Sequence, residues 1–563
     1  MSRVTGVVPR RCRRTLTVLL SLVLLAALGP GVANAQRRPA SDATFYNDAR
    51  TPGADPFVRY DERSGFYYAY STEGADPGYH FAIYRSPDLA VWEKVPGGAL
   101  RDDGTQWAHD WFWAPEVYFN ERTGVYFFFY SGRMNRNVAE HFKYANFEEP
   151  SKIGVAVSRS PEGPFRNITT APIDYYPYDP DYHDVNLIMD STQRKPPATL
   201  EEGRTAPLGT YIPYIDPNVF FDDDGRIYLY FSRNAYRNWV WDTDLGKYIE
   251  ESNIYLVELT REWWDDPEGR TMPAIHPRYR DANRAPADPP GVRKDGFTPI
   301  LNYGSDKQSW ENAHVDDYAR SGGQKKDRRW AEGSTTIRTT GKGGKPRYFL
   351  TYSANNYENE HYGVGYATAD SPLGPWRKST ANPVLRQDPA QRLFSTGHGS
   401  IVDTPAGQRY YVHHGRPSTS DSRRIYTSPL SLDPRRDALD IHESTTDQPI
   451  PDGVAPLRLT PQRRWVEVPA GGAATVPVEV TSRAGATFDL TNPLNRLRAE
   501  VFPSWAGTAE VRGGEVVVRA SHPGVAVLTM TYQRQRADGG YVDVSNLRPR
   551  RAPVAARVAL YLR

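Results

Sequence analysis

Residues 216–232 read Asp216-Pro-Asn-Val-Phe-Phe-Asp-Asp-Asp-Gly-Arg-Ile-Tyr-Leu-Tyr-Phe-Ser232. The first part is a short strand-forming run, and the Asp/Gly cluster at 222–225 favours a tight turn. The last part is rich in the aromatic and branched residues that strands prefer. The stretch therefore predicts a β-hairpin, and it matters because the same order of strand, turn and strand recurs along the chain.

The chain contains four further stretches of this kind. They run from Asp55 to Ser71, Ala114 to Ser131, Glu332 to Ser353 and His398 to His414. A second hairpin signal follows each copy, so each unit supplies about four strands, and four-stranded sheets repeated around an axis form a β-propeller. We therefore predict an all-β protein with a five-bladed β-propeller over residues 42–450. The alternative is a β-sandwich in which the hairpin pattern recurs by chance. Five copies in one register disfavour this alternative.

The repeat stops after about residue 457. Residues 461–563 contain short alternating runs of apolar and polar residues, which are typical of a small β-sandwich. We predict a separate β-sandwich domain there, either immunoglobulin-like or carbohydrate-binding. A polysaccharide-binding role and a spacer role both remain open.

The N-terminus has the features of a secretory leader. Four arginines at positions 10, 11, 13 and 14 precede an apolar run, and Ala33-Asn-Ala35 is a small-residue cleavage site. We expect residues 1–35 to be a signal peptide cleaved near Ala35/Gln36, so that the protein is secreted. Export by the general secretory route and by the twin-arginine route both remain open. No other stretch is apolar enough to span a membrane.

Removing this leader changes the bulk properties of the chain. Its five arginines move the formal charge from +2 to −3, and it contains the only cysteine, Cys12. The mature protein then has no basic excess that would favour nucleic acid as a partner, and it has no thiol nucleophile. Its 36 tyrosines and 13 tryptophans suit a β-rich fold or a surface that stacks on sugar rings. We expect a monomer.

The repeat places one residue of each copy in an equivalent position. These residues are Asp55, Ala114, Asp216, Glu332 and His398. A circular repeat would direct all five towards a common axis. Inverting hydrolysis of a glycosidic bond needs one carboxylate to activate water and one carboxylic acid to protonate the leaving oxygen. A neighbouring carboxylate can keep that acid protonated. Asp55, Asp216 and Glu332 are therefore the candidate catalytic residues, and Ala114 would leave room for a sugar ring.

Each of these residues also has an ordinary structural interpretation. Asp-Pro pairs commonly start turns, so an isolated Asp55 or Asp216 would more often be structural. A single buried Glu332 would more often pair with an arginine. The shared register of the three carboxylates favours the catalytic interpretation.

Taken together, these motifs resemble glycoside hydrolase family 43. The resemblance covers residue 42 to about residue 430 and rests on Asp55-Pro56, Phe112-Trp-Ala-Pro-Glu116, Ile215-Asp-Pro-Asn-Val-Phe-Phe-Asp-Asp-Asp-Gly225, Ala331-Glu-Gly333, Ser371-Pro-Leu-Gly-Pro-Trp376 and Gly397-His-Gly-Ser400. The chain departs from the family at Gly333-Ser334, where Gly-Pro is usual, and at Glu116, where Asp is usual.

The resemblance implies a role for each candidate. It makes Asp55 the general base, Asp216 the residue that orients and tunes the acid, and Glu332 the general acid. Trp113 would line the subsite of the terminal ring, and His398 would lie near the axis beneath the sugar. No cofactor is required, but the family pattern is compatible with a structural calcium ion at the axis. His398 is the one candidate for metal contact, through water.

The sequence thus predicts a secreted, inverting, exo-acting glycoside hydrolase that releases terminal pentose or furanose sugars from polysaccharide or oligosaccharide. Arabinofuranosidase is the first choice, then xylosidase, and the long loops at 166–212 and 262–330 make galactofuranosidase a third. The alternative is a non-catalytic glycan-binding propeller, which the three retained carboxylates disfavour. Candidate specificity contacts of low rank are His183, Asp184, Asn186, Glu311 and His314.

Overall fold

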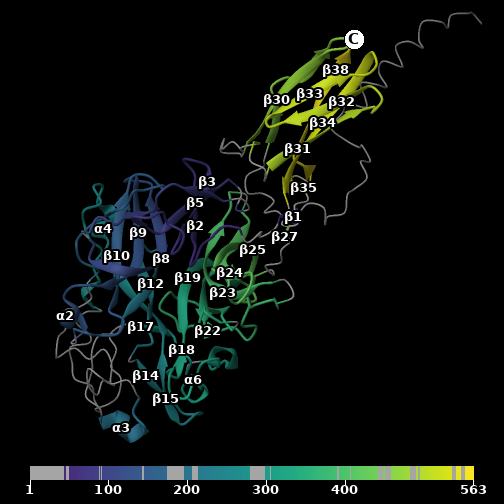
Figure 1. The fold of residues 1–563 in the computed structure, drawn as a ribbon. Coiled ribbons are helices and arrows are strands. Elements are labelled where there is room, and N and C mark those ends of the chain that lie inside the picture. The colour runs from purple at the N-terminus through teal and green to yellow at the C-terminus, as the bar shows by residue number, and fades with distance from the viewer. Residues whose placement is uncertain are drawn as a thin grey trace, which may run out of the picture. The chain divides into compact units, whose positions relative to one another are not determined.

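The computed structural model describes residues 44–45, 50–173, 196–205, 213–278, 298–441, 448–449 and 458–563, apart from short interruptions within these ranges (Figure 1). The predicted signal peptide and the candidates His183, Asp184 and Asn186 lie outside these residues. Within the described ranges, no helix is both long and apolar enough to cross a membrane.

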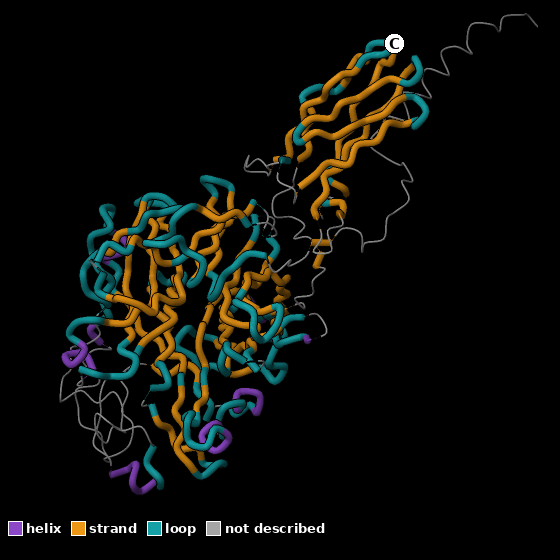
Figure 2. Tube along the Cα trace, viewed as in Figure 1, coloured by secondary structure: helices purple, strands orange, loops and turns teal. Residues whose placement is uncertain are grey.

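The predicted all-β class is confirmed. Strands make up most of the described chain, and the helices are short (Figure 2). The α-helices with described residues are α2 (Val138–Phe142), α3 (Leu200–Thr205), α4 (Glu262–Asp265) and α6 (Asp317–Arg320). Two 3-10 helices are η2 (Ser309–Asn312) and η3 (Lys342–Gly344).

Residues 57–441 form five antiparallel four-stranded sheets, here numbered in chain order. Sheet 1 contains β2 (Phe57–Asp61), β3 (Phe66–Ser71), β5 (Ala82–Ser86) and β6 (Glu93–Val95). Sheet 2 contains β8 (Ala108–Asn120), β9 (Val125–Met134), β10 (Ser151–Ser158) and β11 (Arg166–Asn167). Sheet 3 contains β12 (Tyr214–Phe221), β13 (Ile227–Arg233), β16 (Asn253–Leu259) and β17 (Thr298–Leu301). Sheet 4 contains β19 (Ala331–Thr340), β20 (Pro346–Ala354), β21 (Gly363–Ala369) and β22 (Arg377–Lys378). Sheet 5 contains β23 (Phe394–Asp403), β24 (Arg409–Arg416), β25 (Arg424–Asp433) and β26 (Ala438–Ile441).

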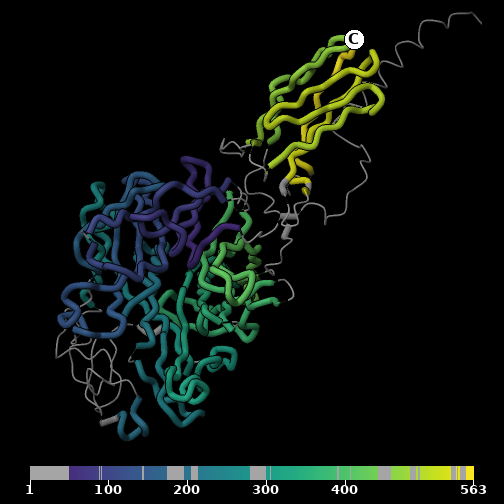
Figure 3. The backbone as a smooth tube through the Cα atoms, in the orientation of Figure 1, coloured from purple at the N-terminus to yellow at the C-terminus, as the bar shows by residue number. Residues whose placement is uncertain are grey.

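The five sheets follow one another in chain order and close into a ring (Figure 3). The first strand of each sheet contacts the first strand of the next, and β23 contacts β2. At this closure, the backbone N–H of Val58 donates to Ser400 Oγ at 2.8 Å, and that hydroxyl donates to the carbonyl oxygen of Pro56 at 3.1 Å. The first strands therefore surround a common centre.

Smaller sheets lie outside this series. One contains β14 (Trp239–Asp242), β15 (Lys247–Glu251) and β18 (Arg328–Arg329). Two-stranded sheets pair β4 (Tyr79–His80) with β7 (Leu100–Arg101), β1 (Thr44–Phe45) with β27 (Gln448–Pro449), and β36 (Ser545–Asn546) with β37 (Ala552–Pro553).

The aromatic run of each second strand fills the space between sheets. Phe127, Phe128 and Phe129 of β9 are fully buried, as Tyr70 of β3 is. Tyr70 and Phe128 meet edge to face with ring centres 6.0 Å apart, a favourable arrangement for aromatic pairs. The strong aromatic enrichment of the repeats thus forms the core that positions the first strands.

Residues 458–562 form two further sheets that share one apolar core. The first contains β28 (Arg458–Pro461), β30 (Ala473–Thr481), β33 (Glu515–Ala520) and β32 (Gly507–Arg512). The second contains β29 (Trp465–Val468), β38 (Ala555–Leu562), β34 (Gly524–Gln535), β31 (Asn495–Phe502) and β35 (Tyr541–Asp543). Residues in these strands alternate between buried and exposed, as expected for strands with one buried face.

Candidate active site

A pocket of about 460 Å³ gathers residues from all five sheets. It is lined by Asp55, Trp111, Trp113, Glu149, Ile215, Asp216, Asn234, Tyr236, Arg328, Trp330, Glu332, Asn355, Asn356, Tyr357, Glu358, Tyr362, His398 and Arg423. Five of the six predicted site residues are among them. The exception is Ala114, which is buried and does not line the pocket.

The backbone at the start of each first strand turns in the same way. One residue there is left-handed in every sheet: Asp55 (φ 48°), Ala114 (φ 49°), Asp216 (φ 56°), Gly333 (φ 60°) and His398 (φ 33°). This conformation is uncommon for residues other than glycine, and such strain concentrates at functional sites. It directs successive side chains of the first strands into the pocket.

The register of the fourth repeat differs from the sequence alignment by one residue. Ile215 pairs with Ser232, and Glu332 pairs with the equivalent Ser353. Glu332 therefore occupies the position of Ile215, while Gly333 occupies that of Asp216. The prediction that Glu332 is equivalent to Asp55 and Asp216 was wrong, because it followed the acidic residues and not the serine that ends four of the five hairpins.

Gly333 has a steric role in this register. A Cβ atom there would lie 2.7 Å from Cγ of His398, so the missing side chain leaves space for the imidazole. The imidazole Nδ1 lies 3.5 Å from Asp55 Oδ1 and 4.0 Å from Asp216 Oδ2. His398 thus lies between two of the carboxylates.

Asp55 is held in its ionised form. Burial by itself would raise the pKa of its carboxyl, but the charges of Arg423 and His398 outweigh that effect and bring the pKa well below its ordinary range. Arg423 Nη1 donates to Oδ1 at 3.1 Å, and Thr72 Oγ1 donates to Oδ2 at 2.7 Å. The backbone N–H of Ala114 in turn donates to Thr72 Oγ1 at 2.9 Å. An ionised carboxylate of this kind can accept a proton from water.

Glu332 has the opposite environment. Burial, together with repulsion from Asp55, raises the pKa of its carboxyl to about 7, against a hydrogen bond from Tyr362 that lowers it. Tyr362 lies close to Glu332 because Gly397 leaves it space, since a Cβ atom on Gly397 would lie 2.2 Å from the tyrosine ring. A carboxyl that keeps its proton near neutral pH can act as an acid.

Asp216 shares the buried environment of Glu332. Burial raises the pKa of Asp216 to about 7, and the charges of Glu332 and Asp55 contribute to the increase. Its Oδ2 nevertheless accepts hydrogen bonds from the Gly333 N–H at 3.1 Å and Ser232 Oγ at 3.3 Å. Hydrogen bonds of this kind favour the ionised form. When the two carboxyls compete for one proton, we therefore place it on Glu332.

The tryptophans form a supported platform at the pocket. The rings of Trp111 and Trp113 stack with centres 5.3 Å apart and an angle of 13° between their planes. The guanidinium of Arg133 lies 3.8 Å from the centre of the Trp111 ring, and Asp110 pairs with this guanidinium through both carboxylate oxygens. Trp111 and Trp113 both line the pocket, and these contacts hold the Trp111 ring in place.

Sequence reasoning missed Trp111, Glu149, Tyr362 and Arg423. The motif Trp111-Phe-Trp113 signalled the first. The other three lie between the second and third strands of their sheets, outside the stretches in which the repeat sets a register.

Glu116 and the predicted specificity contact Glu311 both have structural roles. Glu116 is buried outside the pocket, where the Asn218 amide donates to its Oε2 at 3.2 Å and burial raises its pKa to about 8. Glu311 is 2% exposed and pairs with Lys378 at 2.8 Å. Neither lines the pocket.

The predicted contact of His398 with a metal ion would run through water. Calcium prefers six to eight oxygen ligands. Among the residues that the structure describes, no group of three or more His, Cys, Asp or Glu side chains has an arrangement that could hold a metal ion. No step of the chemistry below is routed through an ion.

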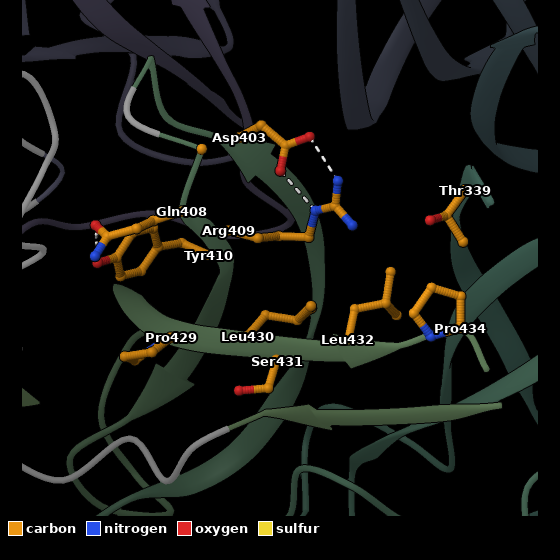
Figure 4. Close-up of a pocket in the computed structure, with 11 residues that line it drawn as sticks. Thr339, Asp403, Gln408, Arg409, Tyr410, Pro429, Leu430, Ser431, Leu432 and Pro434 are labelled. Atoms are coloured by element: carbon orange, nitrogen blue, oxygen red, sulfur yellow. Dashed lines mark hydrogen bonds and ion pairs between the residues drawn. The ribbon is translucent and has the colours of Figure 1, made fainter. Parts of the chain in front are cut away.

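A second pocket, of about 480 Å³, has no comparable chemistry (Figure 4). It lies along β24 and β25, where Arg409 donates to both carboxylate oxygens of Asp403 at 2.6 and 2.7 Å (Figure 4). These two charges satisfy each other. The pocket with Asp55, Asp216 and Glu332 is therefore the candidate active site.

Comparison with known proteins agrees with this choice. The family description "Glycosyl hydrolases family 43" matches residues 49–194 and 301–434, which include Asp55, Glu332 and His398. The chain belongs to this family. The enzyme is therefore an O-glycosyl hydrolase that acts on a carbohydrate substrate, and inversion is a property of its family.

The individual relatives have low sequence identity to this chain. The enzyme is 25% identical over 381 residues to "Beta-D-galactofuranosidase xynD" of Aspergillus niger, which covers 66% of this chain and 76% of the relative. It is 27% identical over 200 residues to "Xylosidase/arabinosidase 43A" of Humicola insolens, covering 36% of this chain and 43% of the relative.

Solved structures also resemble the chain. One is a thermostable family-43 glycoside hydrolase, with a TM-score of 0.48, 24% identity, and coverage of 72% of this chain and 97% of the other. Another is an endo-1,4-beta-xylanase from Bacteroides thetaiotaomicron, with a TM-score of 0.45, 28% identity, and coverage of 71% and 96%.

Proposed function

We propose that the enzyme is an exo-acting, inverting hydrolase with Asp55 as general base and Glu332 as general acid. Asp216 orients and tunes the acid, and Trp113 and His398 contact the terminal sugar. One observation carries the proposal: two carboxyls in one pocket have environments that push their pKa values in opposite directions. Such a pair is what separate acid and base roles require.

In the proposed reaction, Asp55 takes a proton from a water molecule while the water oxygen bonds to the anomeric carbon. The bond between that carbon and the glycosidic oxygen breaks. Glu332 gives its proton to the departing oxygen, so the aglycone leaves as an alcohol. Attack and departure occur on opposite faces of the ring, and the released sugar has the inverted anomeric configuration.

The proposed glycone is a pentose or a furanose. The two relatives are named as a β-D-galactofuranosidase and a xylosidase/arabinosidase. Arabinofuranose, xylose and galactofuranose are therefore the sugars to test. A pocket lined from all five sheets favours removal of a terminal sugar over internal cleavage.

The proposal extends to the organisation of the chain. We propose that the ring of five sheets is a five-bladed propeller that carries catalysis over residues 42–450. The two sheets of residues 458–562 would form a β-sandwich domain at about 461–563. Secretion after removal of residues 1–35, a monomeric state and a structural calcium ion remain proposals from the sequence.

A panel of aryl glycosides tests the proposed function. We expect wild-type enzyme to release aryl alcohol from at least one of the α-L-arabinofuranoside, β-D-xyloside and β-D-galactofuranoside. On phenyl glycosides, whose leaving group is poorly activated, we expect Glu332→Gln to lose about 10²- to 10⁴-fold, the range that general acid catalysis supplies. A folded wild-type protein that bound these sugars without cleaving any of them would instead support a non-catalytic glycan-binding protein.

A further inference from the structure

Glu149 is a fourth buried carboxylate in the active-site pocket, and the proposed reaction does not use it. It lies in the connection between β9 and β10 and is 4% exposed. Burial raises the pKa of its carboxyl to about 7, although a hydrogen bond with Tyr236 and the charge of Arg328 lower it. The Asn234 amide also donates to its Oε1. A buried carboxylate that faces a pocket is costly unless it has partners, so its presence calls for a function.

Three polar residues hold Glu149 in place, and together with it they form what we call the Glu149 wall: Glu149, Asn234, Tyr236 and Arg328. All four line the pocket. The guanidinium of Arg328 lies 4.4 Å from the centre of the Tyr236 ring, and its Nε donates to Glu250 at 2.8 Å. The wall is therefore ordered before any ligand arrives, which lowers the entropic cost of binding.

The wall retains capacity for further hydrogen bonds. A carboxylate offers about four lone-pair positions. Among the described residues, the side chains of Asn234 and Tyr236 make hydrogen bonds to the Glu149 carboxylate. About two acceptor positions therefore remain for donors that enter the pocket. Neutral hydroxyl groups are the donors that a sugar supplies.

The charged groups of the pocket disfavour an acidic ligand. Five acids line it: Asp55, Glu149, Asp216, Glu332 and Glu358. The two arginines that line it are already paired, Arg423 with Asp55 at 3.1 Å and Arg328 with Glu250 at 2.8 Å. A uronic acid would bring a further negative charge without gaining an unpaired guanidinium. The ligand of this wall is therefore neutral.

The wall is built from different elements than the reacting carboxylates. Asp55, Asp216 and Glu332 lie at the starts of first strands. Glu149, Asn234 and Tyr236 follow the second strands of sheets 2 and 3, and Arg328 belongs to β18. A sugar whose anomeric carbon lies between Asp55 and Glu332 leaves the wall, in the same pocket, for another part of the molecule. In a furanose, the exocyclic group is the part that projects from the ring.

We propose that the Glu149 wall binds the exocyclic diol of a hexofuranose glycone, with the two neighbouring hydroxyls donating to the Glu149 carboxylate. This inference rests on the proposed function and assigns its glycone as a neutral hexofuranose of the galactofuranose type. An α-L-arabinofuranoside has the same ring configuration as a β-D-galactofuranoside but carries one exocyclic hydroxyl in place of two. Comparing these two substrates therefore measures the contribution of the exocyclic diol.

The test compares wild type and Glu149→Gln on these two aryl furanosides. Replacing the carboxylate weakens a charge-assisted hydrogen bond, typically worth about 1.5–3 kcal/mol or roughly 10- to 150-fold. We expect KM for the galactofuranoside to rise at least about tenfold, with kcat changed less than about threefold. KM for the arabinofuranoside should change less than about threefold. Glu148→Gln is the matched control, because Glu148 is the neighbouring acid and does not line the pocket.

Each alternative outcome overturns the inference. At a pH below the alkaline limb, where a change in the pKa of Glu332 does not alter the rate, equal losses on both substrates would mean that Glu149 does not bind the diol. Thermal unfolding then shows whether the substitution damages the fold. A wild-type enzyme that cleaves the arabinofuranoside but not the galactofuranoside would also overturn it while leaving the proposed function intact. Failure to cleave any glycoside of the panel would instead refute the proposed function itself.

Discussion

The hydroxyl of Tyr362 donates a hydrogen bond to Oε1 of Glu332 at 2.9 Å. Tyr362 also stacks on His414, with ring centres 5.6 Å apart and nearly parallel planes. This contact fixes the side chain that we assign as the general acid. The hydrogen bond lowers the pKa of Glu332, whereas burial raises it, and the balance leaves the pKa at about 7.

Removing this hydrogen bond should move the pH dependence in a known direction. Glu332 must be protonated to act as an acid, so activity should fall as pH rises through about 7. Tyr362→Phe removes a contact that lowers the pKa, so the alkaline limb of kcat/KM should move to higher pH. A pH–rate profile of both proteins measures this, and a shift to lower pH would contradict the assignment.

Glu149→Gln should move the same limb the other way. The negative charge of Glu149 contributes to the raised pKa of Glu332. Neutralising it should lower that pKa, so the alkaline limb should move to lower pH. The same profile on the arabinofuranoside measures this effect apart from any change in diol binding. An unchanged limb would show that the two carboxyls do not interact.

Arg423 should control the acidic limb. Its guanidinium holds the pKa of Asp55 below the ordinary range, against the burial that raises it. Arg423→Gln removes this charge and leaves a buried carboxylate, so the pKa of Asp55 should rise. Activity, which needs Asp55 ionised, should then disappear at a higher pH on the acidic side. We expect the shift in kcat/KM profiles, and an unmoved acidic limb would exclude Asp55 as the base.

Gly333→Ala should damage the site through His398. The new Cβ atom would meet the imidazole at 2.7 Å, and the backbone at Gly333 is left-handed with φ 60°. Both effects act at the residue next to Glu332, so we expect kcat to fall at least about tenfold, by misplacement of catalytic groups. Gly407→Ala is a matched control, because Gly407 has a similar φ of 77° but open space around its Cβ position. Equal effects of the two substitutions would mean that backbone strain alone is responsible.

Much of this arrangement follows from the sequence. The hairpin at 216–232 recurs as the first two strands of every sheet, and its aromatic residues fill the core. Asp55, Asp216 and Glu332 line one pocket because the repeat brings the starts of the first strands to one centre.

Other features depend on contacts between distant segments. Arg423 meets Asp55 across 368 positions of the chain, and no local pattern encodes that pair. The shifted register at Gly333 was hidden because the alignment followed the acidic residues and not the serines Ser232 and Ser353. Glu149 and Tyr236 lie outside the repeat units, so their position in the pocket depends on how the connections fold.

The most direct test of the central claim is the leaving-group dependence of Glu332→Gln. A general acid matters when the leaving oxygen needs a proton and matters little when the leaving group is a stable phenolate. On whichever glycoside the wild type cleaves, we expect the variant to lose at least about 10³-fold with an unactivated alkyl or sugar aglycone. With a 2,4-dinitrophenyl aglycone the loss should stay below about 30-fold. Equal losses in kcat/KM on both aglycones would contradict the assignment of Glu332 as the acid.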